Sequence, residues 1–119
     1  MLSRKYAKTA CAAALAALSL GAQAQVSGGS VKIGVLTDLS GTYSDLAGSG
    51  AVLATRMAID DFIANEKPNF KIEVVTADHQ NKADIASNKA REWIERENVD
   101  TVTELVTTST ALAVMKVAK

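Results

Sequence analysis

The chain has 119 residues, of which 48% are hydrophobic and 22% are charged, with 13 Lys plus Arg against 13 Asp plus Glu. This balance is typical of a folded protein and excludes an intrinsically disordered chain. The formal net charge of zero gives no sign of a surface that binds nucleic acid. A single cysteine excludes a disulfide framework within the chain and a zinc site built from cysteines. The length allows one domain at most.

Residues 1–24 predict a cleavable secretory signal peptide, which implies export. Positive charges at Arg4, Lys5 and Lys8 precede an Ala/Leu-rich run that is too short to cross a membrane core of about 30 Å. A small-x-small sequence at 22–24 then suits a signal peptidase. The expected mature chain has 95 residues, with 10 basic and 13 acidic residues and a net charge of −3.

The rest of the chain predicts a Gly/Ser-containing flexible leader, 25–30, and then three repeats of strand, polar loop and helix. The expected elements are strand 31–37, helix 49–65, strand 70–77, helix 83–98, strand 101–106 and a third helix from Thr110 onward. Pro68 ends the first helix, because proline cannot continue one. The order βαβαβα predicts parallel strands with right-handed crossovers, and therefore a three-layer, doubly wound α/β sheet.

Apolar residues at helical spacing predict which faces of the helices cover the sheet. The expected buried residues are Val52, Thr55, Ile59, Phe62 and Ile63 in the first helix, Ile85, Ala86, Ala90, Trp93 and Ile94 in the second, and Phe70, Ile72, Val74 and Val75 in the second strand. Glu92 and Arg96 are four residues apart, so we expect them to pair on the outer face.

Ligands of doubly wound sheets bind beyond the carboxyl ends of the strands, which directs attention to the loops 38–48, 78–82 and 107–109. The first loop is long for a strand-to-helix connection and rich in hydroxyl groups. Its Tyr43 offers a stacking face to a ligand. The alternative is an ordinary polar cap with Tyr43 on the surface.

The third loop carries the strongest binding signal, because four consecutive hydroxyl residues, 107–110, stand directly before a predicted helix. One of them would satisfy an N-cap. The others, with the free amides of the first turn, would form a neutral hydrogen-bonding cradle for a carboxylate. We predict that Thr107, Thr108 and Ser109 make the contacts.

Enzyme chemistry has little support in these loops. His79 is the only histidine, so it has no second His or Cys with which to share a metal, and no Ser/His/Asp pattern surrounds it. We therefore predict no catalytic residue, no metal and no cofactor. Gly48-Ser49-Gly50, with Asp78 after the second strand, favours a dinucleotide site only weakly. Leu53 occupies the third glycine position, and the glycines come late after the strand.

These loops in this order resemble a known family. VKIGVLTDLSGTYSDLAGSG, followed by AIDDF at 58–62, is similar to the start of type I periplasmic binding proteins, in particular the leucine/isoleucine/valine-binding family of ABC transporter substrate-binding proteins. DHQNKAD at 78–84 and NKAREW at 88–93 resemble one subgroup of that family. LVTTSTALA at 105–113 resembles its loop for the carboxylate of the ligand.

The resemblance implies a periplasmic receptor that closes two lobes around a small solute and delivers it to an inner-membrane ABC permease. The solute would be a branched-chain amino acid or a related carboxylate such as an aromatic acid. Thr107, Thr108 and Ser109 would hold its carboxylate, and Tyr43 would be a further contact. Residues 31–119 are expected to form an incomplete N-terminal lobe that binds weakly or not at all. A nucleotide-dependent Rossmann-like enzyme domain and a truncated product without function remain as alternatives.

Overall fold

The structure is a computed structural model that describes residues 26–119. The predicted signal peptide lies outside these residues, as does Gln25 at the start of the predicted leader. All six predicted elements are present. They are β1 (Ser30–Thr37), α2 (Gly48–Glu66), β2 (Lys71–Asp78), α3 (Ala83–Arg96), β3 (Thr101–Thr103) and α4 (Thr108–Val117), preceded by a short 3-10 helix, η2 (Ser27–Gly29).

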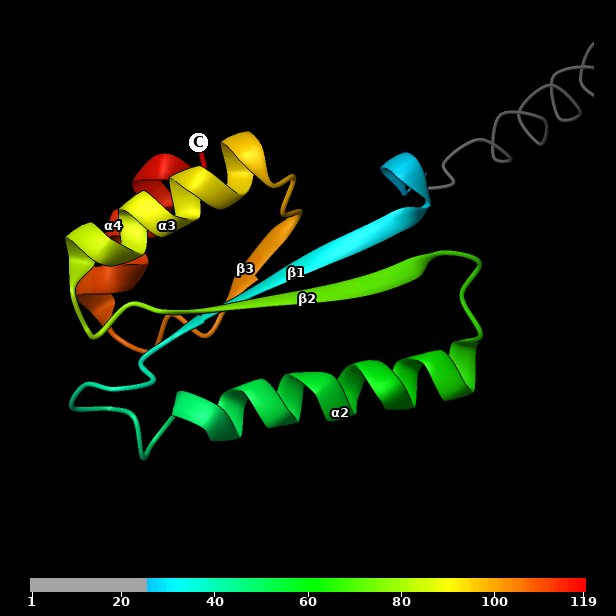
Figure 1. The fold of residues 1–119 in the computed structure, drawn as a ribbon, viewed down its shortest axis with the longest axis horizontal. Helices are drawn as coiled ribbons and strands as arrows, with labels where there is room; N and C mark the ends of the chain where they lie inside the picture. The colour runs from blue at the N-terminus through cyan, green and yellow to red at the C-terminus, as the bar shows by residue number, and fades with distance from the viewer. Residues whose placement is uncertain (1–25) are drawn as a thin grey trace, which may run out of the picture.

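The three strands form one parallel sheet in the order β2-β1-β3. The chain passes from β1 to one neighbour and then crosses back over β1 to the other. Crossovers of one hand then place their helices on opposite faces. Accordingly, α2 covers one face, and α3 and α4 cover the other (Figure 1). The predicted α/β, doubly wound fold is confirmed.

The core lies between the sheet and the pair α3–α4. Its buried residues are Leu36, Ala86, Ala90, Trp93, Val99 and Val114. The indole of Trp93 packs directly on the backbone of β1, because a Cβ added at Gly34 would lie 2.6 Å from the ring. Glycine is therefore the residue that allows α3 to approach the central strand so closely.

The opposite face is packed more loosely than the sequence predicts. Phe62 and Ile63 of α2 are 41% and 42% exposed. A hollow of about 420 Å³ lies between Ile59 and Phe62 of α2 and the sheet residues Ile33 and Ile72. The prediction that Phe62 and Ile63 are buried is wrong, because among the described residues no second helix lies beside α2 to close this layer.

Several smaller predictions are also corrected. Ile94 is exposed. Ile72, Val74 and Val75 of β2, and Phe70 directly before it, are half-buried, since β2 is an edge strand of the sheet. Glu92 pairs with Lys89, at 2.7 Å, in place of the predicted Arg96. β3 ends at Thr103 and not at Val106, because Glu104 adopts a left-handed φ of 70°, which leaves the extended ladder.

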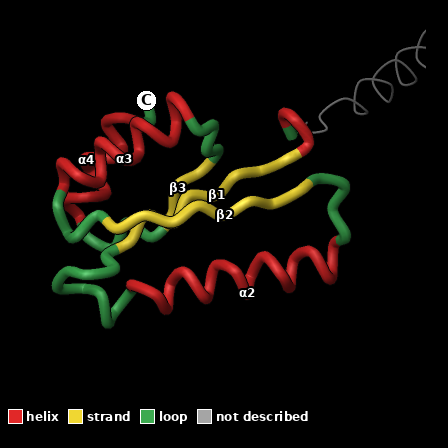
Figure 2. Tube along the Cα trace, in the orientation of Figure 1, coloured by secondary structure: helices red, strands yellow, loops and turns green. Residues whose placement is uncertain are grey.

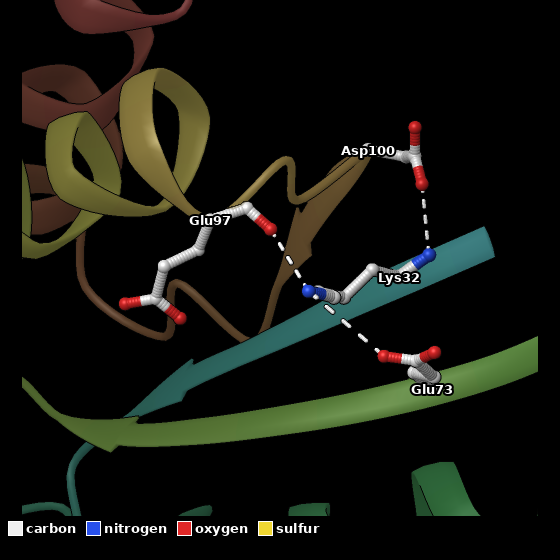
Figure 3. A network of polar contacts seen from close by, with 4 residues as sticks. All are labelled: Lys32, Glu73, Glu97 and Asp100. Carbon is white, nitrogen blue, oxygen red and sulfur yellow. Dashed lines mark hydrogen bonds and ion pairs between the residues drawn. The ribbon is translucent and has the colours of Figure 1, made fainter. Parts of the chain in front are cut away.

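A polar network ties the amino-terminal end of the sheet together (Figure 3). The Lys32 ammonium donates to the carbonyl of Glu97 at 2.9 Å and lies 3.9 Å from the carboxylate of Glu73. The Lys32 amide donates to the carboxylate of Asp100 at 2.8 Å. The network fixes the α3–β3 connection on β1, at the end of the sheet opposite to the three predicted ligand loops.

Candidate functional site

The connections that follow the three strands gather at one end of the sheet (Figure 2). The winding direction reverses between β1 and β3, because β1 leads to α2 on one face and β3 leads to α4 on the other. Such a reversal leaves a crevice between the two connections, which is where open α/β sheets bind ligands. The loop 38–47 and the start of α4 border this position.

The amino terminus of α4 presents the predicted hydroxyl residues, although the helix begins two residues earlier than predicted. Thr107 is the N-cap residue, with an extended backbone, and its carbonyl accepts the first helical bond from Ala111 at 2.9 Å. Thr108 and Ser109 therefore belong to the first helical turn and not to the preceding loop. Their side chains are exposed.

The hydroxyl hydrogens can be assigned along this turn. Buried Thr110 donates its hydroxyl to the carbonyl of Thr107 at 2.9 Å. Each hydroxyl has one hydrogen, so the 2.9 Å contact between the hydroxyls of Thr107 and Thr110 assigns Thr107 as the donor. Ser109 is then the donor in its long, 3.5 Å contact with Thr107. The side chain of Thr107 is thus committed within the turn.

Several donors remain for a ligand. The hydroxyl of Thr108 has no partner among the described residues, and that of Ser109 has only the long contact. The amides of Thr108, Ser109 and Thr110 also have no acceptor within residues 26–119, as is normal for a first turn. The turn carries no acidic residue, and its amides supply partial positive charge. This geometry suits one carboxylate.

The loop 38–47 is organised by the buried carboxylate of Asp38. Its two oxygens accept from the amide of Gly41 at 2.7 Å and from the amide of Tyr43 at 2.9 Å. Glycine is required at 41, because a Cβ there would lie 2.5 Å from the Asp38 carboxylate. The carbonyl of Tyr43 accepts from Leu46 and Ala47, and Tyr43 is 37% exposed. Tyr43 is therefore held at its backbone and remains partly accessible to solvent.

Asp78 connects the first and second loops. Its carboxylate accepts from the amide of Leu39 at 2.9 Å, the hydroxyl of Ser40 at 2.6 Å and the amide of Gln80 at 2.8 Å. Burial acts to raise the pKa of Asp78, but the hydrogen bonds from Ser40, Leu39 and Gln80 outweigh it and hold the pKa below its usual value. In a dinucleotide site, this carboxylate would accept hydrogen bonds from the ribose hydroxyls. In the structure it already accepts from these three protein donors.

His79 is fully buried directly after β2. Its Nδ1 accepts from the amide of Asn81 at 2.9 Å, which places the proton of the neutral ring on Nε2. Burial lowers the pKa of His79, against the opposing influence of Asp38 and Asp78. The Nε2 atom, like Thr37 Oγ1 and Asn81 Oδ1, is buried without a protein partner among the described residues. His79 is therefore a buried ring that is uncharged at neutral pH.

The structure thus brings the predicted ligand-binding residues to one end of the sheet, but they are not all connected by hydrogen bonds. No hydrogen bond within residues 26–119 links Tyr43 to the start of α4. The sequence interpretation missed the roles of Asp38 and Asp78. A signal was present, because Asp directly at the end of a strand commonly accepts from amides a few residues later in a turn.

Two negative findings apply to residues 26–119. No group of three or more His, Cys, Asp or Glu is placed to hold a metal ion. No helix in this part of the chain has the length and apolar character needed to cross a membrane.

Comparison with known proteins identifies relatives. The sequence profile described as "Periplasmic binding protein" matches residues 30–119. A periplasmic binding protein from Burkholderia mallei is 50% identical, with a TM-score of 0.69 over 76% of this chain and 24% of that one. A branched chain amino acid ABC transporter periplasmic ligand-binding protein from Burkholderia xenovorans is 41% identical, with a TM-score of 0.65 over 74% of this chain and 23% of that one.

A third structure shares the fold at lower identity. It is the branched-chain amino acid transporter substrate binding protein LivJ from Streptococcus pneumoniae in complex with isoleucine, 22% identical with a TM-score of 0.66 over 75% of this chain and 26% of that one. The chain therefore spans about a quarter of the length of these structures. No protein with a curated description matches the chain significantly.

Proposed function

Because the chain belongs to the periplasmic binding protein family, we propose that it acts in the periplasm as the solute-binding component of an ABC importer. Its partners are a small carboxylate-bearing solute and an inner-membrane permease. Branched-chain amino acids are the first candidates for the solute, and aromatic acids are the second. Two related structures are named as branched-chain amino acid transport proteins, and one of them holds isoleucine. These names support the choice of solute.

One observation carries the proposal most strongly. The start of α4 offers the hydroxyls of Thr108 and Ser109 and three amides that have no acceptor among the described residues, at the carboxyl end of a parallel sheet. A carboxylate satisfies such donors without a basic side chain. In this assignment Thr108 and Ser109 contact the carboxylate, Thr107 holds the turn in place, and Tyr43 stacks on the solute from the opposite connection.

The described residues supply one wall of the crevice. Small-molecule sites usually bury about 70–90% of their ligand, so this wall alone should bind an amino acid with a Kd of about 1 mM or weaker. Ligand-observed NMR detects binding in that range. The test is saturation-transfer difference NMR of the chain with L-isoleucine, benzoate and NAD, each alone.

We expect signal from L-isoleucine or benzoate and none from NAD. Thr108→Val keeps the shape of the side chain and removes its hydroxyl, so it should weaken binding by roughly tenfold, the usual effect of losing a hydrogen bond to a charged group. Thr101→Val is the matched control, because Thr101 is exposed at the far end of β3. Signal from NAD alone would contradict the proposal, as would equal effects of the two valine substitutions.

A further inference from the structure

The carboxylate of Asp78 bridges two of the three connections at the ligand end of the sheet. Asp78 is the last residue of β2 and lies in register with Thr37, the last residue of β1. One oxygen, Oδ1, accepts from the amides of both Leu39 and Gln80, at 2.9 and 2.8 Å. The other oxygen, Oδ2, accepts from the hydroxyl of Ser40 at 2.6 Å. A single side chain therefore holds the beginning of the loop 38–47 against the beginning of the β2–α3 loop.

Asp38 continues the same support further into the loop. Its carboxylate takes the amides of Gly41 and Tyr43. Together, Asp38 and Asp78, which we call the carboxylate frame, accept from the loop at Leu39, Ser40, Gly41 and Tyr43 in succession. Asp38 is buried, whereas Asp78 is half-buried and reaches across from the neighbouring strand. The path of the loop up to Tyr43 is thus set from two strands at once.

We propose that Asp78 is a positioning residue that fixes the loop 38–47, and with it Tyr43, in the geometry that receives the solute. This inference rests on the proposed function, because Tyr43 matters only if a solute enters the crevice beside it. Asp78 itself does not contact the solute in this proposal. Its contribution is to order the loop before binding, which removes part of the conformational entropy that binding would otherwise have to overcome.

The hydrogen-bond pattern makes the proposal specific. In Asp78→Asn the amide oxygen can take the place of Oδ1 and accept from both Leu39 and Gln80. The new NH₂ group would replace Oδ2 and can donate to the hydroxyl of Ser40, which is able to accept. Asp78→Ala removes all three bonds. The hydrogen bonds that lower the pKa of Asp78 also keep it ionised at neutral pH, so the asparagine variant separates loss of charge from loss of positioning.

The experiment measures amide hydrogen exchange by NMR in the 119-residue chain without solute. In Asp78→Ala we expect exchange at Leu39 and Gln80 to accelerate by roughly tenfold to a hundredfold, as these amides lose a charged acceptor. The amide of Tyr43 keeps its own acceptor, Asp38. It should nevertheless accelerate by roughly threefold or more, the lower range of coupling within one hydrogen-bond network. Asp78→Asn keeps an uncharged acceptor and should restore most of the protection at all three amides.

Two further variants control the result. Ser40→Ala removes only the bond to Oδ2 and should produce a smaller acceleration. Asp45→Ala removes an exposed carboxylate from the same loop, one with no hydrogen bond to the described residues, and should change none of the three rates. The single tryptophan, Trp93, reports through its fluorescence that each variant keeps its core. Unchanged exchange at Tyr43 in Asp78→Ala would overturn the proposal, as would an asparagine variant no better than alanine.

A second measurement connects the loop to binding. With L-isoleucine as the probe, Asp78→Ala should raise the Kd by roughly two- to tenfold, the effect of ordering one side chain during binding instead of before it, and Asp78→Asn should not. If the unsubstituted chain binds no L-isoleucine, the proposed solute is wrong, but the exchange rates still decide the positioning role. An increase in Kd with both substitutions would overturn the proposal, because it would indicate direct contact with the Asp78 charge.

Discussion

On one face of the sheet, α3 buries Trp93 almost completely, whereas on the other face α2 leaves Phe62 two-fifths exposed. Both helices carry apolar residues at helical spacing, but α3 concentrates them on one face, whereas α2 also carries exposed apolar residues at Leu53 and Met57. The difference arises because α3 packs beside α4, while among the described residues α2 lies alone on its face (Figure 1). Periodicity identifies the inward side of a helix, but the completeness of the layer decides how deeply that side is buried.

The strands show the same contrast. Along β2, Val75 and Ala77 pack against the core under α3 and α4, while Ile72 and Val74 face α2 and border hollows. On the α3 side, small residues let the helix approach closely, and Gly34 receives the indole of Trp93. The α3–α4 face should therefore contribute most of the folding free energy of the described residues.

The largest expected effect compares one aromatic residue from each face. Trp93→Ala should lower the free energy of unfolding by about 3–5 kcal/mol, the usual loss for a buried aromatic side chain. Phe62→Ala should lower it by only about 1 kcal/mol, since a large part of that ring is already in water. Urea denaturation followed by circular dichroism measures both. Equal losses would show that α2 is packed as tightly as α3.

A glycine pair tests the same contrast at smaller magnitude. Gly34→Ala places a methyl group against Trp93 and should destabilise the protein by about 1–3 kcal/mol, as overpacking does. Gly50→Ala on α2 meets no atom within 4 Å and should stabilise by about 0.5 kcal/mol through helix propensity. When Trp93→Leu is already present, Gly34→Ala should lower the free energy of unfolding by less than it does in the unsubstituted chain. An equal loss in both backgrounds would mean that the added methyl group does not clash with the indole.

A third prediction concerns the loop that leads into α3, through pH. Burial lowers the pKa of His79 below its unfolded value of 6.5, so the unfolded state binds more protons as the solution becomes acidic. Stability from this residue is complete above about pH 6.5 and is lost as the pH falls below it. The free energy of unfolding should decrease from pH 7 to pH 5.

His79→Asn supplies the control for this pH dependence. Its amide oxygen can accept from the amide of Asn81 in place of Nδ1, and it does not titrate in this range. The decrease between pH 7 and pH 5 should therefore be smaller in the variant than in the unsubstituted chain. If both lose the same free energy, another group is responsible for the acid sensitivity.

The fold was largely predictable, and particular residues explain why. Alternation of β-rich and helical segments, with Pro68 and the glycines between them, identifies all six elements and the parallel sheet. The errors arise where a local backbone choice or the surroundings of an element decide the outcome. Glu104 shortens β3 by adopting a positive φ, which no residue-type rule assigns to glutamate. The exposure of Phe62 depends on what lies beside α2, which periodicity does not encode.

The sequence indicates the hydroxyl donors of the candidate site, but it does not indicate the hydrogen bonds that hold those donors and the neighbouring loop in place. The run of hydroxyl residues at 107–110 marked the start of α4 from sequence alone. The commitment of the Thr107 hydroxyl to Thr110 follows only from the folded geometry of the turn. The bridge from Asp78 to Leu39 and Ser40 likewise depends on the pairing of β1 with β2, which brings together residues far apart in the chain.

The proposed function requires a carboxylate to bind at the amino terminus of α4. The most direct measurement follows the amide ¹⁵N and ¹H shifts of Thr108, Ser109 and Thr110 while L-isoleucine is added, and repeats the titration with L-isoleucinamide, which lacks the carboxylate. We expect saturable shift changes at these three amides with the amino acid and none with L-isoleucinamide. Equal shifts with both compounds, or changes confined to other residues with the amino acid, would contradict it.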